Sequence, residues 1–345
     1  MKVIHIPDTI EINNDIRSLT SVVCHSLSDV PDIIDTWNEG KVVDIEGYYE
    51  NAKINRVYVD RVHVKKAFAE YTAAYNADDP KIKLKIDHTY RVAALCERIA
   101  KAAGMSAYDI ELAWLSGMLH DVGRFEQIKR YNTFSDADSV DHAKFGADLL
   151  FKDGLISTFL NGMVKCTGYK PGALEDRYNS DGVFLYDRLN KSDMEMLELA
   201  IRCHNMYRIP QGLNRREQAF CNVLRDADKV DIFKVNIDTP LEEIYNTTTE
   251  ELMKSDITDE VLEAFDEEHC ILKAIRRTPA DTVIGHVSLA YELVYDESVR
   301  ITVEQGYLAK LMHFHSDNEE TNRKMAMVRE KMDSYVKKRI GEKDA

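Results

Sequence analysis

Histidine and aspartate residues of the chain have the types and the spacing of metal ligands. They are His88, His120, Asp121, His142, His204 and Asp228. We expect them on inward faces of separate helices. A single histidine on such a face is more often a core residue bonded to a carbonyl, but the group is harder to explain in this way. Imidazole nitrogens and carboxylate oxygens together suit borderline first-row metals, so the sequence predicts a metal centre.

The adjacent pair His120 and Asp121 is expected at the end of a buried helix, within the stretch from Ala107 to Arg124. This stretch has almost no polar face, and a helix that is apolar on all sides belongs inside a domain. An unpaired carboxylate there would cost on the order of several kcal/mol, so Asp121 needs a metal or a strong hydrogen-bonding partner. Ser106 and Asp109 have capping-box spacing at the start of the helix.

The other elements are predicted from apolar spacing and capping residues. We expect helices over residues 62–75, 85–104, 138–152, 193–204 and 214–233, with Asn214 and Glu217 as a capping box, and later helices over 241–254, 259–269, 280–295, 303–315 and 319–340. Gly123 is expected to turn the chain, and residues 125–138 to form a long loop, which is more often functional than idle. Residues 165–187 are rich in glycine and predict an irregular excursion.

The predicted fold class is mainly α, with three regions. Residues 1–60 are expected to form a small N-terminal extension, in which the β-branched runs KVIHI, KVVDI and NRVYV predict short strands of a hairpin or meander. Residues 61–240 are expected to form the helical core that holds the metal centre. Residues 241–345 are expected to form a C-terminal helical region packed on that core.

Composition limits the possible partners. The formal charge of −15 argues against a nucleic-acid polymer, which needs clustered Lys and Arg, whereas a small phosphate ester is compatible if a bound cation reverses the local field. The sequence has no apolar run long enough to span a membrane and no signal-peptide pattern at its start, so we expect a cytoplasmic protein without a membrane partner. The six cysteines lack CxxC spacing and are expected to be reduced. The sequence favours no oligomeric state.

Three segments, DHTYRV, LHDVGRF and RDADKVD, resemble in this order the signature of the HD-domain superfamily of metal-dependent phosphohydrolases. The resemblance covers roughly residues 62–236 and implies a helical bundle with His88, His120, Asp121 and Asp228 as metal ligands. Asp226 competes for the last position. Asp228 is favoured because it precedes Lys229 in an ADK context, as in the family motif.

His142 and His204 match two further histidines that the two-metal branches of this superfamily place between the HD pair and the final aspartate. In this respect the chain resembles HD-GYP phosphodiesterases and symmetrical diadenosine tetraphosphatases, although it lacks the GYP motif. The resemblance implies two divalent ions per chain, with Fe or Mn favoured over Mg, Ni, Co or Zn. Asp121 would bridge them.

The function expected from this resemblance is hydrolysis of a small phosphate ester or anhydride, a nucleotide in particular, by a metal-bound hydroxide. Asp121 and Arg124 are the expected catalytic residues, because a cation at Arg124 would stabilise charge on the phosphoryl group. The expected phosphate contacts are Arg124, Lys85, Lys229 and Arg208. Two alternatives stay open: an HD-type di-iron oxygenase, since some relatives with the same six ligands use O₂, and a nucleotide-binding regulatory protein with little turnover.

Overall fold

The computed structural model of the protein describes residues 59–76, 78–160, 189 and 191–341, together with two short strands near the N-terminus. The chain divides into two compact units, one comprising Met1–Tyr58 and Gly168–Asp187, the other Val59–Thr167 and Arg188–Ala345. In the first unit, strands β1 (Ile4–His5) and β2 (Val22–Val23) pair in parallel. β1 lies within the predicted KVIHI run, but a parallel pair is not a hairpin, and β2 was not predicted. The KVVDI run and residues 165–187 lie outside the described residues.

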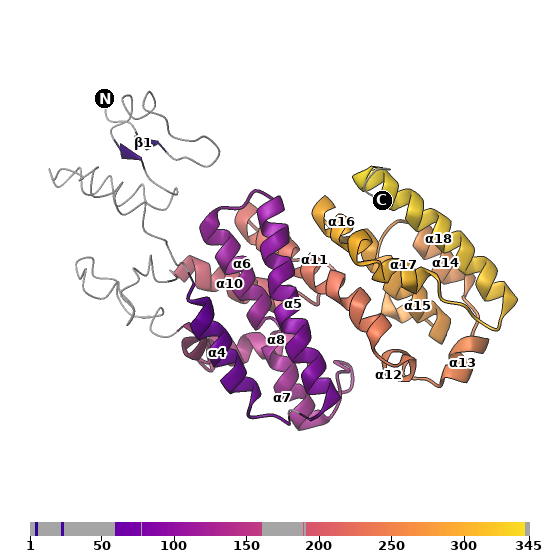
Figure 1. Cartoon of the computed structure of the whole chain (residues 1–345), viewed down its shortest axis with the longest axis horizontal. Coiled ribbons are helices and arrows are strands. Elements are labelled where there is room, and N and C mark those ends of the chain that lie inside the picture. Colours follow the sequence, from indigo (N-terminus) through magenta and orange to yellow (C-terminus); the bar gives the residue numbers. More distant parts are fainter. Residues whose placement is uncertain are drawn as a thin grey trace. The chain divides into compact units, whose positions relative to one another are not determined.

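All secondary-structure elements in the described residues of the second unit are helices, which confirms the predicted mainly α fold class (Figure 1). Its first helices are α4 (Arg61–Thr72), α5 (Pro80–Ala102), α6 (Ala107–Leu119), α7 (Val122–Tyr131), α8 (His142–Ala147), a π-helical turn (Asp148–Lys152), α9 (Ile156–Leu160), α10 (Lys191–Cys203) and α11 (Arg215–Asp238).

The later helices are α12 (Leu241–Tyr245), α13 (Thr249–Lys254), α14 (Asp259–Asp266), α15 (Pro279–Val287), α16 (Asp296–Gln305), α17 (Tyr307–Met312) and α18 (Glu319–Ile340), with 3₁₀ turns at Lys273–Ile275 and Ser288–Glu292. The last helix has the predicted bounds. The predicted helix over 241–254 is instead two, because the chain adopts a left-handed conformation at Asn246. Within the described residues, no helix is both long and apolar enough to cross a membrane.

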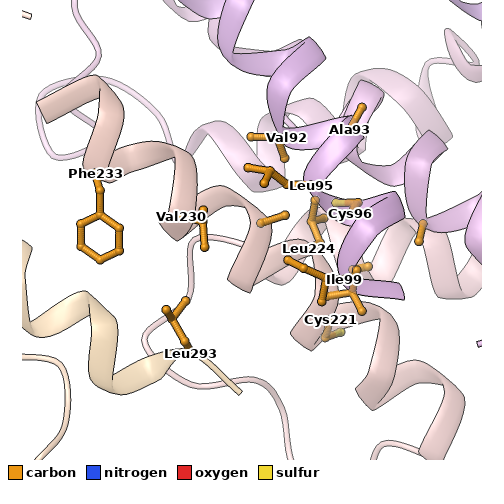
Figure 2. Packing of buried hydrophobic residues seen from close by; sticks show 14 of the residues in the cluster. Val92, Ala93, Leu95, Cys96, Ile99, Cys221, Leu224, Val230, Phe233 and Leu293 are labelled. Atoms are coloured by element: carbon orange, nitrogen blue, oxygen red, sulfur yellow. The ribbon is translucent and has the colours of Figure 1, made fainter. Parts of the chain in front are cut away.

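Helix α6 lies at the centre of the core, as predicted, and every residue of Leu112–Leu119 is buried. It packs closely on α5 because Gly117 has no side chain: a Cβ atom there would lie 2.6 Å from the Cα of Ala93. On α5, Val92, Leu95, Cys96 and Ile99 meet Cys221 and Leu224 of α11 (Figure 2). These three helices therefore position His88, the adjacent residues His120 and Asp121, and Asp228.

The capping predictions were right at one helix and half right at another. The capping box of Asn214 and Glu217 at the start of α11 is complete, since each side chain accepts from the backbone of the other. At α6, the Ser106 side chain accepts from the backbone N–H of Asp109, but the Asp109 carboxylate accepts from the Arg216 guanidinium instead of completing a box. The ion pair between Asp109 and Arg216 therefore takes the place of the second hydrogen bond of a capping box.

The prediction of a loop over residues 125–138 is wrong for its first half. The chain does not turn away at Gly123 but continues as α7 to Tyr131, and Asn132 ends this helix with a φ of 53°. Gly123 serves close packing instead, because a Cβ atom there would lie 2.7 Å from the Gly146 backbone nitrogen of α8. The next helix, α8, begins only at His142 and is capped by Asp141, not by Asp138 or Ser139.

Candidate metal centre

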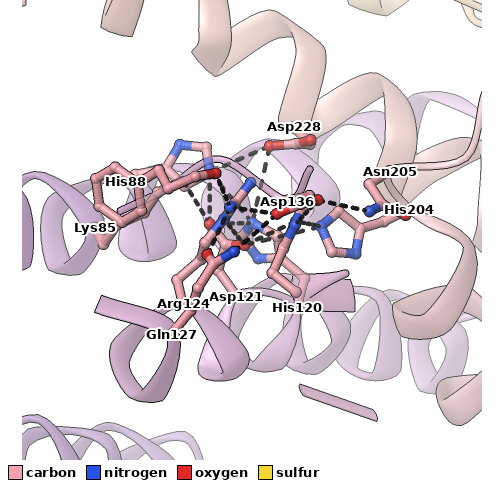
Figure 3. A network of polar contacts seen from close by, with 12 residues as sticks. Lys85, His88, His120, Asp121, Arg124, Gln127, Asp136, His204, Asn205 and Asp228 are labelled. Carbon is pink, nitrogen blue, oxygen red and sulfur yellow. Dashed lines mark hydrogen bonds and ion pairs between the residues drawn. The ribbon is translucent and has the colours of Figure 1, made fainter. Parts of the chain in front are cut away.

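The structure brings all six predicted ligands into one cluster, and all of them except His142 are labelled in Figure 3. His88 lies in α5 and Asp228 in α11, His120 follows α6 and His204 follows α10, Asp121 precedes α7, and His142 is the first residue of α8. The four histidines and Asp121 are buried, and the Asp228 side chain is 15% exposed. Residues that lie up to 140 positions apart in the sequence thus share one interior site.

The carboxylate of Asp121 lies between two pairs of imidazoles. Its Oδ2 atom is 3.5 Å from Nε2 of His88 and 3.5 Å from Nε2 of His120. Its Oδ1 atom is 3.5 Å from Nε2 of His142 and 3.8 Å from Nε2 of His204. The Nε2 atoms within the pairs are 3.2 Å and 3.0 Å apart. Both pairs of imidazole nitrogens therefore face the same carboxylate.

Asp228 belongs to only one of these groups. Its Oδ1 atom lies 3.2 Å from Nε2 of His88 and 3.9 Å from Nε2 of His120. We call His88, His120, Asp228 and Oδ2 of Asp121 the first half of the centre. The second half is formed by Oδ1 of Asp121 and the two histidines that face it, His142 and His204.

The other ring nitrogen of each imidazole is already bonded to the protein. Nδ1 of His120 lies 2.7 Å from the Gly117 carbonyl oxygen, and Nδ1 of His204 lies 2.7 Å from that of Ile201. A carbonyl only accepts, so Nδ1 is the donor and the lone pair of the neutral ring is on Nε2. The Nε2 lone pairs therefore converge on Asp121.

The rings of His88 and His142 are held in the same way by carboxylates. Nδ1 of His88 is 2.6 Å from Oδ2 of Asp231, and Nδ1 of His142 is 2.7 Å from Oδ2 of Asp136. Metal-bound histidines usually donate their second N–H to a carboxylate or carbonyl in this manner. Converging nitrogen lone pairs and carboxylates fit divalent metal, whose positive charge would offset their mutual repulsion.

The pKa directions agree with this chemistry. Burial, together with nearby positive charge, lowers the pKa of His142 and of His204 to about 4. These rings are therefore neutral near pH 7, as metal ligands must be. His88 differs: burial opposes the change, but hydrogen bonds to Asp228 and Asp231 raise its pKa. A raised pKa means that His88 binds a proton more readily, and a metal cation beside Asp228 would take the place of that proton on Nε2.

Two cations lie at the edge of the cluster. Lys85 Nζ is 2.7 Å from Oδ2 of Asp121, and Arg124 Nε is 3.7 Å from Oδ1. Their side chains are 17% and 14% exposed, against 2% for Asp121, so they separate the buried carboxylate from solvent. Although burial opposes it, Lys85 and the neighbouring histidines hold the pKa of Asp121 well below its usual range. Arg124 Nε is buried and has no hydrogen-bond partner in the described part of the chain.

The other two predicted phosphate contacts are placed differently. Lys229 is buried in α11, and burial lowers its pKa. Arg208 is exposed, with its guanidinium 5.7 Å from the centroid of the Tyr207 ring. Within the described residues, no hydrogen bond or ion pair joins either side chain to the six clustered residues. The structure therefore brings Lys85 and Arg124 to the site, but not Arg208 or Lys229.

Asp226, the alternative to Asp228, is engaged elsewhere. Its carboxylate accepts from the backbone N–H groups of Val294 and Tyr295, at 2.9 Å each, and from the Ser298 hydroxyl at 2.7 Å. Asp226 and Asp228 are two positions apart in the helix, a rotation of about 200°, so their side chains face different directions. Asp226 binds the start of α16, and Asp228 faces the histidines.

Sequence reasoning missed the carboxylates that hold the histidines. Asp231 follows Asp228 by three residues, so helical spacing already put both on neighbouring parts of one face. Asp136 lies between α7 and α8, where no periodicity indicates which of several acidic residues turns inward. Asn205 and Gln127, which both donate to Asp136, were missed as well: Gln127 lies in α7, where a loop was expected, and Asn205 lies just beyond α10.

Comparisons with known proteins agree with this geometry. No curated protein and no solved structure matches the chain. Residues 86–233 match the family model described as the HD domain, and this segment extends from α5 to α11 and contains all six clustered residues. The match supports the HD-domain superfamily for the part of the chain that carries the candidate metal centre.

Proposed function

We propose that the protein is a metal-dependent phosphohydrolase that acts on a small phosphate ester or anhydride, with a nucleotide as the expected substrate. The observation that carries this proposal is the sharing of one buried carboxylate, Asp121, between two pairs of converging imidazole nitrogens, with Lys85 and Arg124 beside it. The HD-domain match supports a metal-dependent hydrolase at the level of the superfamily.

Each half of the centre would hold one divalent ion. The first half offers His88, His120 and Asp228 with Oδ2 of Asp121, and the second half offers His142 and His204 with Oδ1. When bound, divalent ions would lower the pKa of a water molecule and polarise phosphoryl oxygens. Borderline metals such as Fe or Mn suit this nitrogen and oxygen donor set.

Arg124 is the residue best placed to bind the phosphoryl group. Its Nη1 atom donates to Gln127 at 2.8 Å, to the Phe134 carbonyl at 2.8 Å and to Asp136 at 2.9 Å, so the guanidinium is fixed. Its Nε atom has no such partner among the residues that the structure describes. A donor that is already oriented stabilises developing charge without reorganisation. Lys85 adds a second positive charge at the other carboxylate oxygen of Asp121, Oδ2.

The leaving group is limited by the protonation states of the cluster. Burial opposes ionisation of Asp121 and Asp228, but the neighbouring cations and histidines hold the pKa of both carboxyls below the usual range. Neither carboxyl therefore carries a proton to donate near pH 7. This favours a substrate whose leaving group needs no protonation, such as a phosphate of a nucleotide anhydride.

The proposal is tested with a screen of metal-loaded protein. Phosphomonoesters, diesters, dinucleoside polyphosphates and cyclic dinucleotides are offered with Mn²⁺ or Fe²⁺, and released phosphate or nucleotide is measured, with Asp121→Asn protein as the blank. We expect turnover that depends on the added metal. O₂ uptake with candidate diols is measured in parallel. If no compound of the phosphate panel releases phosphate or nucleotide but O₂ is consumed, the oxygenase is supported. Nucleotide binding without turnover would support a regulatory protein.

A further inference from the structure

Each half of the centre contains one histidine backed by a carboxylate, but the two carboxylates are held differently. Asp231, behind His88, is 1% exposed and accepts from Nε and Nη2 of Arg91, at 2.6 and 2.9 Å. Asp136, behind His142, is 32% exposed and lies outside the helices, between α7 and α8. The first half is therefore supported from within α5 and α11, and the second half from a connecting segment.

Asp136 makes contacts that reach several parts of the site at once. Its Oδ2 atom accepts from Nδ1 of His142 at 2.7 Å and from Nδ2 of Asn205, the residue after His204, at 3.3 Å. Its Oδ1 atom accepts from Nη1 of Arg124 at 2.9 Å and from Nε2 of Gln127 at 3.0 Å. One carboxylate thus joins a candidate ligand to the candidate phosphate-binding arginine (Figure 3).

We infer that Asp136 is a positioning residue for the second half of the centre, which keeps Nε2 of His142 directed at Asp121 and fixes Arg124 beside it. The inference rests on the proposed function for the presence of two ions. A carboxylate behind a histidine fixes its tautomer and ring orientation and strengthens its remaining nitrogen as a ligand. Losing this support weakens binding of one ion and leaves the other ion, which Asp231 supports through His88, unaffected.

The test is a titration of metal-free protein with Mn²⁺ by calorimetry, and with Co²⁺ by visible absorption. We expect wild type to bind two ions. Asp136→Asn keeps the size of the side chain but has one acceptor oxygen in place of two, so it cannot accept both from His142 and from Arg124. We expect it to weaken one of the two sites by about 10–100-fold and to change the absorption of Co²⁺ at that site only.

Matched variants separate positioning from a general loss of structure. Asp138→Asn removes the same charge from an exposed position of the same connecting segment and should leave both sites unchanged. Asp231→Asn should weaken the other site. Asp136→Asn added to His142→Ala should cause no further loss of metal affinity, because Asp136 acts through His142, whereas added to His88→Ala its effect should persist in full. Asp136→Glu, which restores a carboxylate, should recover part of the affinity.

The outcomes distinguish this inference from the proposed function. Two ions bound with wild-type affinities by Asp136→Asn would overturn the inference, and so would a wild-type protein that binds a single ion. Additional loss of affinity in the double variant with His142→Ala would also overturn it, since Asp136 would then act by another route. Wild type that binds two ions but hydrolyses no phosphate compound would refute the proposed function alone.

Discussion

Each half of the centre combines two imidazole nitrogens with one oxygen of Asp121, but the two halves stand on different kinds of support. In the first half, His88 and Asp228 project from the interiors of α5 and α11, which pack directly on each other. In the second half, His142 begins the short helix α8, and His204 lies just beyond the end of α10. Side chains within long packed helices are held by many neighbours, whereas helix ends depend on a few hydrogen bonds. We therefore expect the first half to tolerate changes that the second half does not.

The largest effect is expected where the two halves meet. Asp121→Ala removes the carboxylate that both halves share and should reduce metal content from two ions per chain to near zero, with loss of activity. Elemental analysis of protein purified without chelator gives the content, and circular dichroism shows whether the helices remain. Retention of two ions and full activity in this variant would end the assignment of the site.

The next largest effect is expected from variants that each remove a ligand from one half of the centre. His142→Ala should remove the ion of the second half and leave about one ion per chain, and His88→Ala should do the same for the first half. Because a two-metal mechanism needs both ions, each variant should lose activity by at least about 100-fold. Elemental analysis and rate measurements are made on the same samples. A wild type with one ion, unchanged by His142→Ala or His204→Ala, would reduce the site to a single-metal centre.

A smaller effect is expected from the candidate phosphate contact. Arg124→Ala should keep both ions, because Arg124 supplies no ligand atom, but lose rate on the order of 100-fold through the loss of charge stabilisation. Arg130→Ala is the control, since this arginine lies on the same helix, is exposed and pairs with Glu126 at 2.9 Å. Loss of an ion in Arg124→Ala would show that the arginine acts on the metal site and not on the substrate.

The smallest effects concern the glycines that let the helices approach. Gly117→Ala would press α6 away from α5, where a Cβ atom comes within 2.6 Å of the Ala93 backbone, and Gly123→Ala would press α7 away from α8. Alanine usually stabilises a helix relative to glycine. Crowding of this kind, however, lowers the free energy of unfolding by about 1–3 kcal/mol, so both variants should melt at a lower temperature. Gly117→Ala should loosen mainly the first half and Gly123→Ala the second, as a metal titration would show. Unchanged melting temperatures would mean that the neighbouring backbones can yield.

Several of the helices and the six clustered residues could be predicted because they left local signals in the sequence. Apolar spacing marked α5, α6 and α11, and the capping box of Asn214 and Glu217 marked the start of α11. Helix α7 was missed because a glycine and a polar stretch follow the buried helix, and nothing local shows that Gly123 is there for contact with α8. Asp136 could not be predicted because its role depends on contacts with α7, α8 and the end of α10. Such contacts exist only after the chain has folded.

The uninterrupted burial of Leu112–Leu119 has a consequence for hydrogen exchange. Amides that are covered on all sides cannot reach solvent by local fraying, so those of Leu112–Leu119 should exchange only when the whole unit opens. At the end of α6, the Gly117 carbonyl accepts a hydrogen bond from Nδ1 of His120, and Asp121 is the next residue in the chain. His120 and the adjacent Asp121, which supplies the shared carboxylate, are thus held at the end of this buried segment. Ions would therefore enter a site whose central carboxylate is already in place, without first ordering the helix that carries it.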